Sequence, residues 1–117
     1  MIRRLYATLW HLAPFLIRRH LRRRALKSPA YLEHWGERFG QAYPNPIQRP
    51  IWIHAVSVGE TRAAEPLVQA LRRHFPDSPF LITQMTPTGR ATAQSLFPEA
   101  QCRYRPYDTS EWVARVL

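Results

Sequence analysis

Two short polar turns carry the residues of this sequence that are able to do chemistry. The first turn is Ser57-Val58-Gly59-Glu60, and the second is Thr86-Pro87-Thr88-Gly89-Arg90. A glutamate in such a turn can take a proton from a hydroxyl group, as a general base does. Hydroxyls and free backbone N–H groups at a helix start can bind a phosphate or a carboxylate. These two turns are therefore the candidate functional site.

Glu60 has two interpretations that the residues alone leave open. A helix N-terminus stabilises an ionised carboxylate, so Glu60 can act as a base or can simply cap the helix. Gly59 permits a sharp turn and removes side-chain bulk where a ligand approaches. His54, just before the turn, is either a hydrogen-bonded structural histidine, which is the commoner case, or a catalytic one.

The second turn also has two interpretations. Thr86 and Pro87 form a good N-cap and N1 pair, which explains them without any ligand. Alternatively, the two threonine hydroxyls and Arg90 surround an anion at the helix start. Neither turn contains GxGxxG or GxxxxGK[ST], which weighs against a dinucleotide or triphosphate site in this chain.

The elements that must position these turns alternate between strand and helix. Apolar runs predict strands at 51–56, 79–83 and 101–105. Helical spacing predicts a helix from about 60–62 to 75, a second at 87–97, and a third beginning at Glu111. This order predicts an α/β fold with a parallel sheet, in which sites form beyond the carboxyl ends of the strands.

The N-terminal segment is amphipathic and strongly basic. Residues 1–40 contain nine Arg and Lys against two Glu, a net +7, whereas residues 41–117 contain eight against six, a net +2. The apolar stretch 5–17 is shorter than the roughly 20 residues that span a bilayer. We therefore expect residues 1–27 to form a helix that lies on an anionic membrane surface. The alternative is a core helix followed by a solvated basic stretch.

Other cofactor and partner classes are not indicated. Cys102 is the only cysteine, and the five histidines are scattered without ligand spacing, so we expect neither a metal nor another cofactor. The basic segment lacks the interleaved aromatic residues of single-strand binding surfaces, so we expect no nucleic-acid partner. The chain divides into a membrane-associated helix (1–27), a connector (28–50) and a partial α/β domain (51–117).

Several motifs resemble one family in the same order and spacing. They are Trp35-Gly36-Glu37-Arg38-Phe39-Gly40, the HxxSVGE run from His54 to Glu60, Thr83-Gln84-Met85-Thr86-Pro87-Thr88-Gly89 and Pro106-Tyr107-Asp108. Together they resemble the 3-deoxy-D-manno-octulosonic acid (Kdo) transferases of lipopolysaccharide biosynthesis, in their N-terminal portion. Either central motif alone would be weak, whereas the combination is fairly specific.

The resemblance implies an incomplete Rossmann-like N-terminal domain of a GT-B glycosyltransferase. Such an enzyme transfers Kdo from CMP-Kdo to the lipid A precursor, lipid IVA, at the cytoplasmic face of the inner membrane. It implies that Glu60 is the base, with Ser57, Gly59, Thr86, Thr88 and Gly89 around the substrate. CMP-Kdo is expected in a C-terminal domain absent from this chain, so the chain alone is expected to be inactive. The alternatives are another GT-B sugar-nucleotide enzyme and a non-catalytic basic membrane adaptor.

Overall fold

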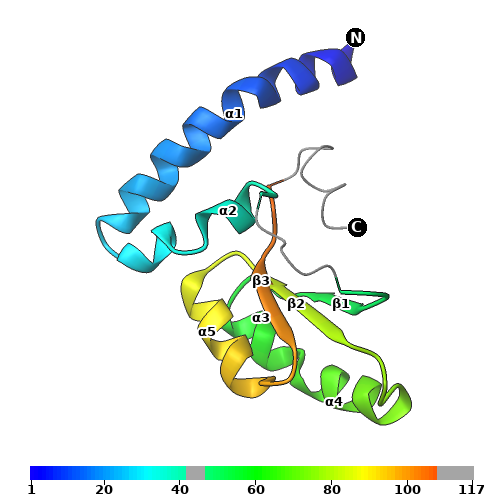
Figure 1. Cartoon of the computed structure of the whole chain (residues 1–117). Coiled ribbons are helices and arrows are strands. Elements are labelled where there is room, and N and C mark those ends of the chain that lie inside the picture. Colours follow the sequence, from blue (N-terminus) through cyan, green and yellow to red (C-terminus); the bar gives the residue numbers. More distant parts are fainter. Residues whose placement is uncertain (42–46, 108–117) are drawn as a thin grey trace. The chain divides into compact units, whose positions relative to one another are not determined.

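The structure, a computed structural model, describes residues 1–41 and 47–107. Two compact units make up the chain, Met1–Trp35 and Gly36–Leu117 (Figure 1). The predicted helix at Glu111 lies outside the described residues. The three segment boundaries expected from the sequence, at 1–27, 28–50 and 51–117, stay predictions.

The first unit consists of a long helix, α1 (Ile2–Ala25), and a short 3-10 helix, η1 (Pro29–Leu32). The helix continues through Pro14, whose ring lacks the N–H that a helix interior normally uses. Its last turn holds Arg22, Arg23 and Arg24, which favourably oppose the negative end of the helix dipole. Within residues 1–41 and 47–107, no helix has a stretch that is both long and apolar enough to cross a membrane.

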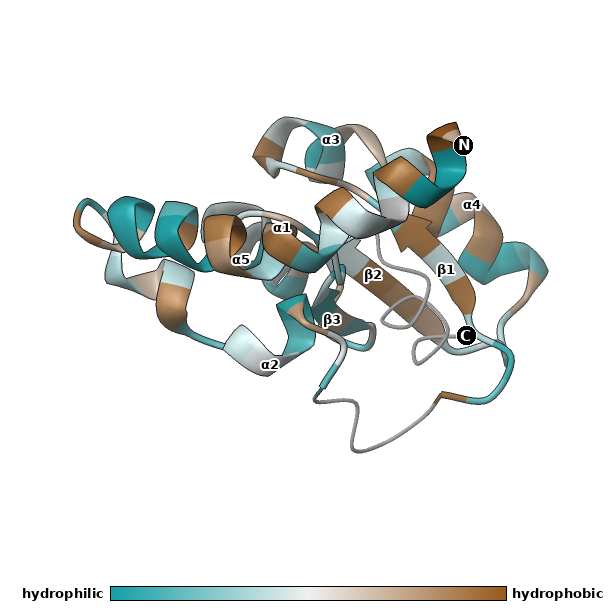
Figure 2. Ribbon diagram, turned by 90° about the horizontal axis from the view of Figure 1, so that it is seen from above, coloured by the Kyte–Doolittle hydropathy of each residue, from teal (hydrophilic) through white to brown (hydrophobic). Residues whose placement is uncertain are grey.

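The second unit contains the predicted parallel sheet. Its strands are β1 (Ile51–His54), β2 (Phe80–Gln84) and β3 (Gln101–Tyr104), in the order β1-β2-β3 with both pairs parallel. The central strand β2 is buried along its whole length, and its hydrophobic residues form a brown band in Figure 2. This small parallel sheet with its helices confirms the mixed α/β class expected from the alternating pattern.

Helices cover one face of the sheet through a compact apolar core. Its buried members come from α4 (Glu65–His74), from β2, from α5 (Pro87–Leu96) and from the residue that follows α5: Val68, Phe80, Ile82, Ala93 and Phe97. Ile51 and Ile53 of β1 face this core, whereas the alternate residues Trp52 and His54 are exposed. Cys102 also packs against the core, and this burial raises the pKa of its thiol to about 11.

The single helix predicted from about 60–62 to 75 is wrong, because the structure has two helices there. The first, α3 (Val58–Ala63), begins earlier than predicted and is capped by Ala64. The second is α4, which carries Pro66 in its first turn. Proline is tolerated in a first turn, where its missing N–H has no helical acceptor to serve. The break at Ala64 therefore gives Pro66 a new first turn instead of an interior position.

Candidate functional site

The two predicted turns lie side by side at the carboxyl edge of the sheet. The backbone N–H of Met85 donates to the carbonyl of Val56 at 3.1 Å, which joins the ends of the two neighbouring strands. Beyond this bond, α3 and α5 pack together. A Cβ added at Gly89 would lie 3.2 Å from the carbonyl carbon of Ser57 and 2.9 Å from Thr86 Oγ1. The structure thus brings Ser57, Thr86 and Gly89 together, as expected for one site.

Glu60 lies in the first turn of α3 and is exposed. Its Oε2 accepts a hydrogen bond from the backbone N–H of Val56 at 2.6 Å. The Ser57 side chain, at the N-cap position, makes no capping hydrogen bond. The bond from Glu60 back to the residue before the N-cap agrees with the capping interpretation of Glu60. Within the described ranges Oε1 has no hydrogen-bond partner, and the role of Glu60 as a base stays a prediction.

Gly59 is not needed for the shape of the turn. It lies inside the first turn of α3, and among the glycines that the structure describes only Gly40 has a positive φ. A Cβ built at Gly59 meets no atom within 4 Å, so packing in the described residues does not require glycine either. The expectation of a sharp turn at Gly59 is wrong. The expectation that Gly59 removes side-chain bulk agrees with the open space around its Cα.

The second turn is an N-cap, as the Thr86-Pro87 pair predicts. Thr86 Oγ1 accepts a hydrogen bond from the Gly89 N–H at 3.1 Å, and α5 begins at Pro87. Thr88 is exposed in this turn. The alternative interpretation, in which Arg90 binds an anionic ligand, is wrong because Arg90 binds a carboxylate of the chain itself. Its guanidinium is buried and forms two hydrogen bonds with the carboxylate of Glu37.

Glu37 and Arg38 are residues of the site region that sequence reasoning missed. They end the short helix α2 (Trp35–Arg38) in the stretch predicted as a connector. Besides Arg90, the Glu37 carboxylate accepts from the backbone N–H of Tyr104 at 2.8 Å. Arg38 donates to the Met85 carbonyl at 2.8 Å, and its guanidinium carbon lies 3.8 Å from the centre of the Tyr104 ring. The buried side chains of Glu37 and Arg38 thus hold Tyr104 and Met85 near the second turn.

Tyr104 is buried, and the guanidinium carbons of Arg38 and Arg90 lie 3.8 Å and 4.8 Å from the centre of its ring. Desolvation raises the pKa of its phenol, and the nearby Arg38 and Arg90 guanidinium groups lower it in part. The only signal in the sequence is the charged pair in Trp35-Gly36-Glu37-Arg38-Phe39-Gly40. Charged residues are mostly exposed, so the pattern gave no reason to expect them in the interior.

His54 ends β1 and its ring is anchored on β2. Its Nδ1 lies 3.1 Å from the carbonyl oxygen and 3.0 Å from Oγ1 of Thr83. Partial burial lowers the pKa of His54, as does the positive charge of Arg105. The hydrogen bond to the Thr83 carbonyl and the charge of Glu60 oppose this shift. The hydrogen bond to Thr83 supports the structural interpretation of His54.

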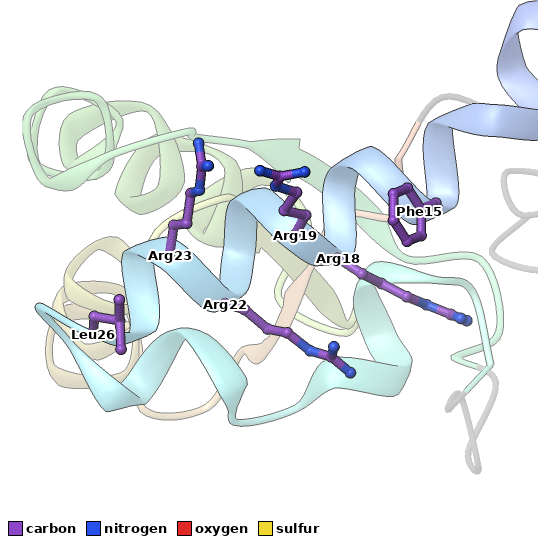
Figure 3. Close-up of a pocket in the computed structure, with 6 residues that line it drawn as sticks. All are labelled: Phe15, Arg18, Arg19, Arg22, Arg23 and Leu26. Atoms are coloured by element: carbon purple, nitrogen blue, oxygen red, sulfur yellow. The ribbon is translucent and has the colours of Figure 1, made fainter.

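No metal site is evident in the part of the chain that the structure describes. No three side chains of His, Cys, Asp or Glu gather there closely enough to hold an ion. In the first unit, a pocket along α1 is lined by Phe15, Arg18, Arg19, Arg22, Arg23 and Leu26. Figure 3 shows Arg19 and Arg23 extending to one side of the helix, and Arg18 and Arg22 to the other. The pocket combines apolar and cationic groups.

Comparison with known proteins identifies one family. Residues 33–117 match the family described as 3-Deoxy-D-manno-octulosonic-acid transferase (kdotransferase). A 3-deoxy-D-manno-octulosonic acid transferase of Bordetella pertussis is 49% identical over 80 residues, which cover 61% of this chain and 18% of that protein. The Haemophilus influenzae transferase of the same name is 39% identical over 83 residues, covering 68% of this chain and 19% of that protein.

A more distant relative matches almost the whole chain. It is a probable mitochondrial 3-deoxy-D-manno-octulosonic acid transferase of Arabidopsis thaliana, 32% identical over 118 residues, which cover 97% of this chain and 26% of that protein. The chain therefore spans about a fifth to a quarter of the length of these relatives. No solved structure matches the chain.

Proposed function

The chain belongs to the 3-deoxy-D-manno-octulosonic-acid transferase family, and on that premise we propose that it forms the acceptor-binding, base-bearing part of a Kdo transferase. The proposed reaction moves Kdo from CMP-Kdo to the lipid A precursor, lipid IVA. The proposed architecture is GT-B, in which this α/β unit faces a second domain that binds the donor. A polypeptide that contains this chain together with such a donor domain is called the complete transferase below.

Glu60 is the proposed base of this reaction. Its carboxylate takes the proton of an acceptor hydroxyl while the hydroxyl oxygen bonds to the anomeric carbon of Kdo. The bond between that carbon and the phosphate oxygen breaks, and its electron pair leaves with CMP. No metal or other cofactor is part of the proposed step.

One observation carries this assignment above all others. The Glu60 carboxylate is exposed at the carboxyl edge of a parallel sheet, and it uses Oε2 for the Val56 N–H. Ligands of open parallel sheets bind at this edge. The capping bond orients the carboxylate, which leaves Oε1 as the atom proposed to receive the proton.

The other proposed substrate contacts surround this carboxylate. The Ser57 hydroxyl makes no capping bond, and Gly59 opens α3 to close approach because no side chain covers its Cα. Thr86, Thr88 and Gly89 form the neighbouring turn, in which Gly89 allows the two helix ends to meet. A polar acceptor therefore finds hydroxyls and bare backbone beside the proposed base.

We further propose that α1 attaches the enzyme to the cytoplasmic face of the inner membrane. Leu5, Leu9, Leu12 and Leu16 are each at least 60% exposed, and they follow one another at helical spacing. Arg19 and Arg23 continue the same stripe, so its apolar part precedes a cationic part. An apolar stripe followed by arginines suits anionic lipid, in which acyl chains lie beneath charged headgroups.

The choice of substrates is tested by a transfer assay with the complete transferase. Labelled Kdo should pass from CMP-Kdo to lipid IVA, and unrelated sugar nucleotides should not serve as donors. Transfer of a different sugar would support another GT-B sugar-nucleotide enzyme instead. Absence of any transfer, together with binding to anionic vesicles, would support a non-catalytic membrane adaptor.

A further inference from the structure

Trp52 and His54 form an aromatic surface on the side of β1 that faces away from the helices. The two positions alternate with Ile51 and Ile53, which pack against the core, so Trp52 and His54 share the opposite face. Trp52 is 38% exposed, and His54, which is partly exposed, ends the strand just before the turn that carries Glu60. Neither side chain belongs to the core between the sheet and the helices.

A single residue of β2, Thr83, holds both rings in place. Trp52 Nε1–H donates to Thr83 Oγ1 at 2.9 Å, and His54 Nδ1 lies within hydrogen-bond distance of the Thr83 carbonyl and hydroxyl oxygens. Thr83 itself is only 1% exposed and pairs with His54 in the sheet register. Because Thr83 already holds both rings in place, a ligand loses less free energy to ordering these side chains when it binds.

The tautomer of His54 considered for ligand binding carries its proton on Nδ1. In this tautomer Nδ1 donates to the Thr83 carbonyl oxygen, which can only accept, whereas the contact with Thr83 Oγ1 alone would permit either tautomer. In the neutral ring, Nε2 is then an acceptor. Nε2 has no hydrogen-bond partner among residues 1–41 and 47–107. Burial and Arg105 lower the pKa of His54, which favours this neutral form near pH 7.

We propose that Trp52 and His54 bind the acceptor sugar beside Glu60, with the sugar ring against the indole and a sugar hydroxyl donating to His54 Nε2. This inference rests on the proposed function, because it gives the acceptor of that reaction a binding surface. A sugar ring has an apolar face of C–H groups and a rim of hydroxyls, which match the indole face and the imidazole acceptor.

The binding test uses the 117-residue chain and the glucosamine disaccharide of the acceptor, prepared without acyl chains. On titration, the NMR signals of His54 Nε2 and of the Trp52 indole N–H should shift, with the Nδ1 signal changing less. His54→Asn should weaken binding roughly two- to tenfold, because it removes one hydrogen bond. His74→Asn on α4 is the matched control and should leave the dissociation constant unchanged.

Two substitutions at His54 separate ligand binding from a structural role. Asparagine keeps a donor near the Nδ1 position, whereas glutamine carries its amide to about the Nε2 position. Binding by Nε2 predicts that His54→Gln retains more affinity than His54→Asn. The opposite order would overturn the proposal, because it would mean that only the Thr83 bond matters. Saturating disaccharide without shifts at Trp52 and His54 would overturn it as well.

The complete transferase distinguishes failure of this inference from failure of the proposed function. If Kdo transfer proceeds and His54→Asn leaves the acceptor KM unchanged, the inference fails while the function stands. If the disaccharide binds at Trp52 and His54 but lipid IVA receives no Kdo, the proposed reaction fails while the sugar-binding surface stands.

Discussion

Gly89 lies directly against the backbone of Ser57, so the first turns of α5 and α3 meet with no side chain between them. Ser57 begins the turn of the proposed base, and Gly89 lies in the turn that follows β2. A side chain at 89 would have to displace backbone atoms of Ser57. The separation of the two turns in the candidate site is therefore set by the absence of a Cβ at Gly89.

Replacing the two glycines by alanine should have opposite effects on stability. Gly89→Ala should lower the free energy of unfolding by about 1–3 kcal/mol, as overpacking does. Gly59→Ala should leave it unchanged or raise it by up to about 1 kcal/mol, because alanine favours helix and the added Cβ points into open space. Urea denaturation checks both. Equal effects of the two substitutions would contradict this packing account.

The buried pair of Glu37 and Arg90 should contribute far more to stability than the exposed pair of Arg72 and Glu99. Glu37→Ala leaves the Arg90 charge buried without its carboxylate, which should cost about 3–5 kcal/mol. Glu99→Ala removes a partner that is 74% exposed and should cost less than about 1 kcal/mol. Chemical denaturation of the two variants measures the difference.

A double substitution tests the reason for this expected loss. Glu37→Leu together with Arg90→Met removes both charges, and it should destabilise the chain less than Glu37→Ala alone. A double variant as unstable as the single one would show that packing, not the unpaired charge, causes the loss.

Stability should depend on pH through His54. Its pKa is lowered in the folded chain, so the folded state favours the neutral ring relative to the unfolded state. The stabilising contribution is complete above the unfolded value of 6.5 and is lost as the pH falls through the lower folded pKa. An NMR titration of the His54 ring should have its midpoint below 6.5. Arg105→Gln should raise this midpoint and Glu60→Gln should lower it further, whereas a midpoint above 6.5 would contradict the assigned causes.

Vesicle binding should depend on the arginine end of the α1 stripe. Each Arg near an anionic surface contributes about 1 kcal/mol, so Arg19→Gln with Arg23→Gln should weaken binding roughly 30-fold. Arg62→Gln with Arg73→Gln removes the same charge from the second unit and is the matched control. Co-sedimentation with anionic vesicles measures both. Loss of lipid binding to an RNA competitor would instead favour a nucleic-acid partner.

The sequence was sufficient where local patterns determine local structure. The apolar runs of β1 and β2 and the Thr86-Pro87 cap were predicted from neighbouring residues, and the structure has all of them. The family was also predicted, because its motifs are contiguous and the family match includes them. Pro66 was harder, because the sequence did not show that one helix would end at Ala63 and another would begin at Glu65 with Pro66 in its first turn.

Long-range pairing accounts for what was missed. Glu37 and Arg90 are 53 positions apart, and nothing in either neighbourhood indicates the other. At a helix start, Arg90 looks the same whether its carboxylate comes from a ligand or from the chain. The anchoring of Trp52 and His54 on Thr83 likewise depends on the strand register. Such contacts follow from topology, which local periodicity does not specify.

The rate of Kdo transfer by the Glu60→Gln variant of the complete transferase tests the central claim most directly. The glutamine oxygen can still accept the Val56 N–H, so the cap is kept, but the amide cannot take a proton at neutral pH. We expect kcat to fall at least about a hundredfold, with the free energy of unfolding nearly unchanged. Glu65→Gln on α4 is the matched control and should retain full activity. A kcat for Glu60→Gln within about twofold of the unsubstituted enzyme would contradict the assignment of Glu60 as the base.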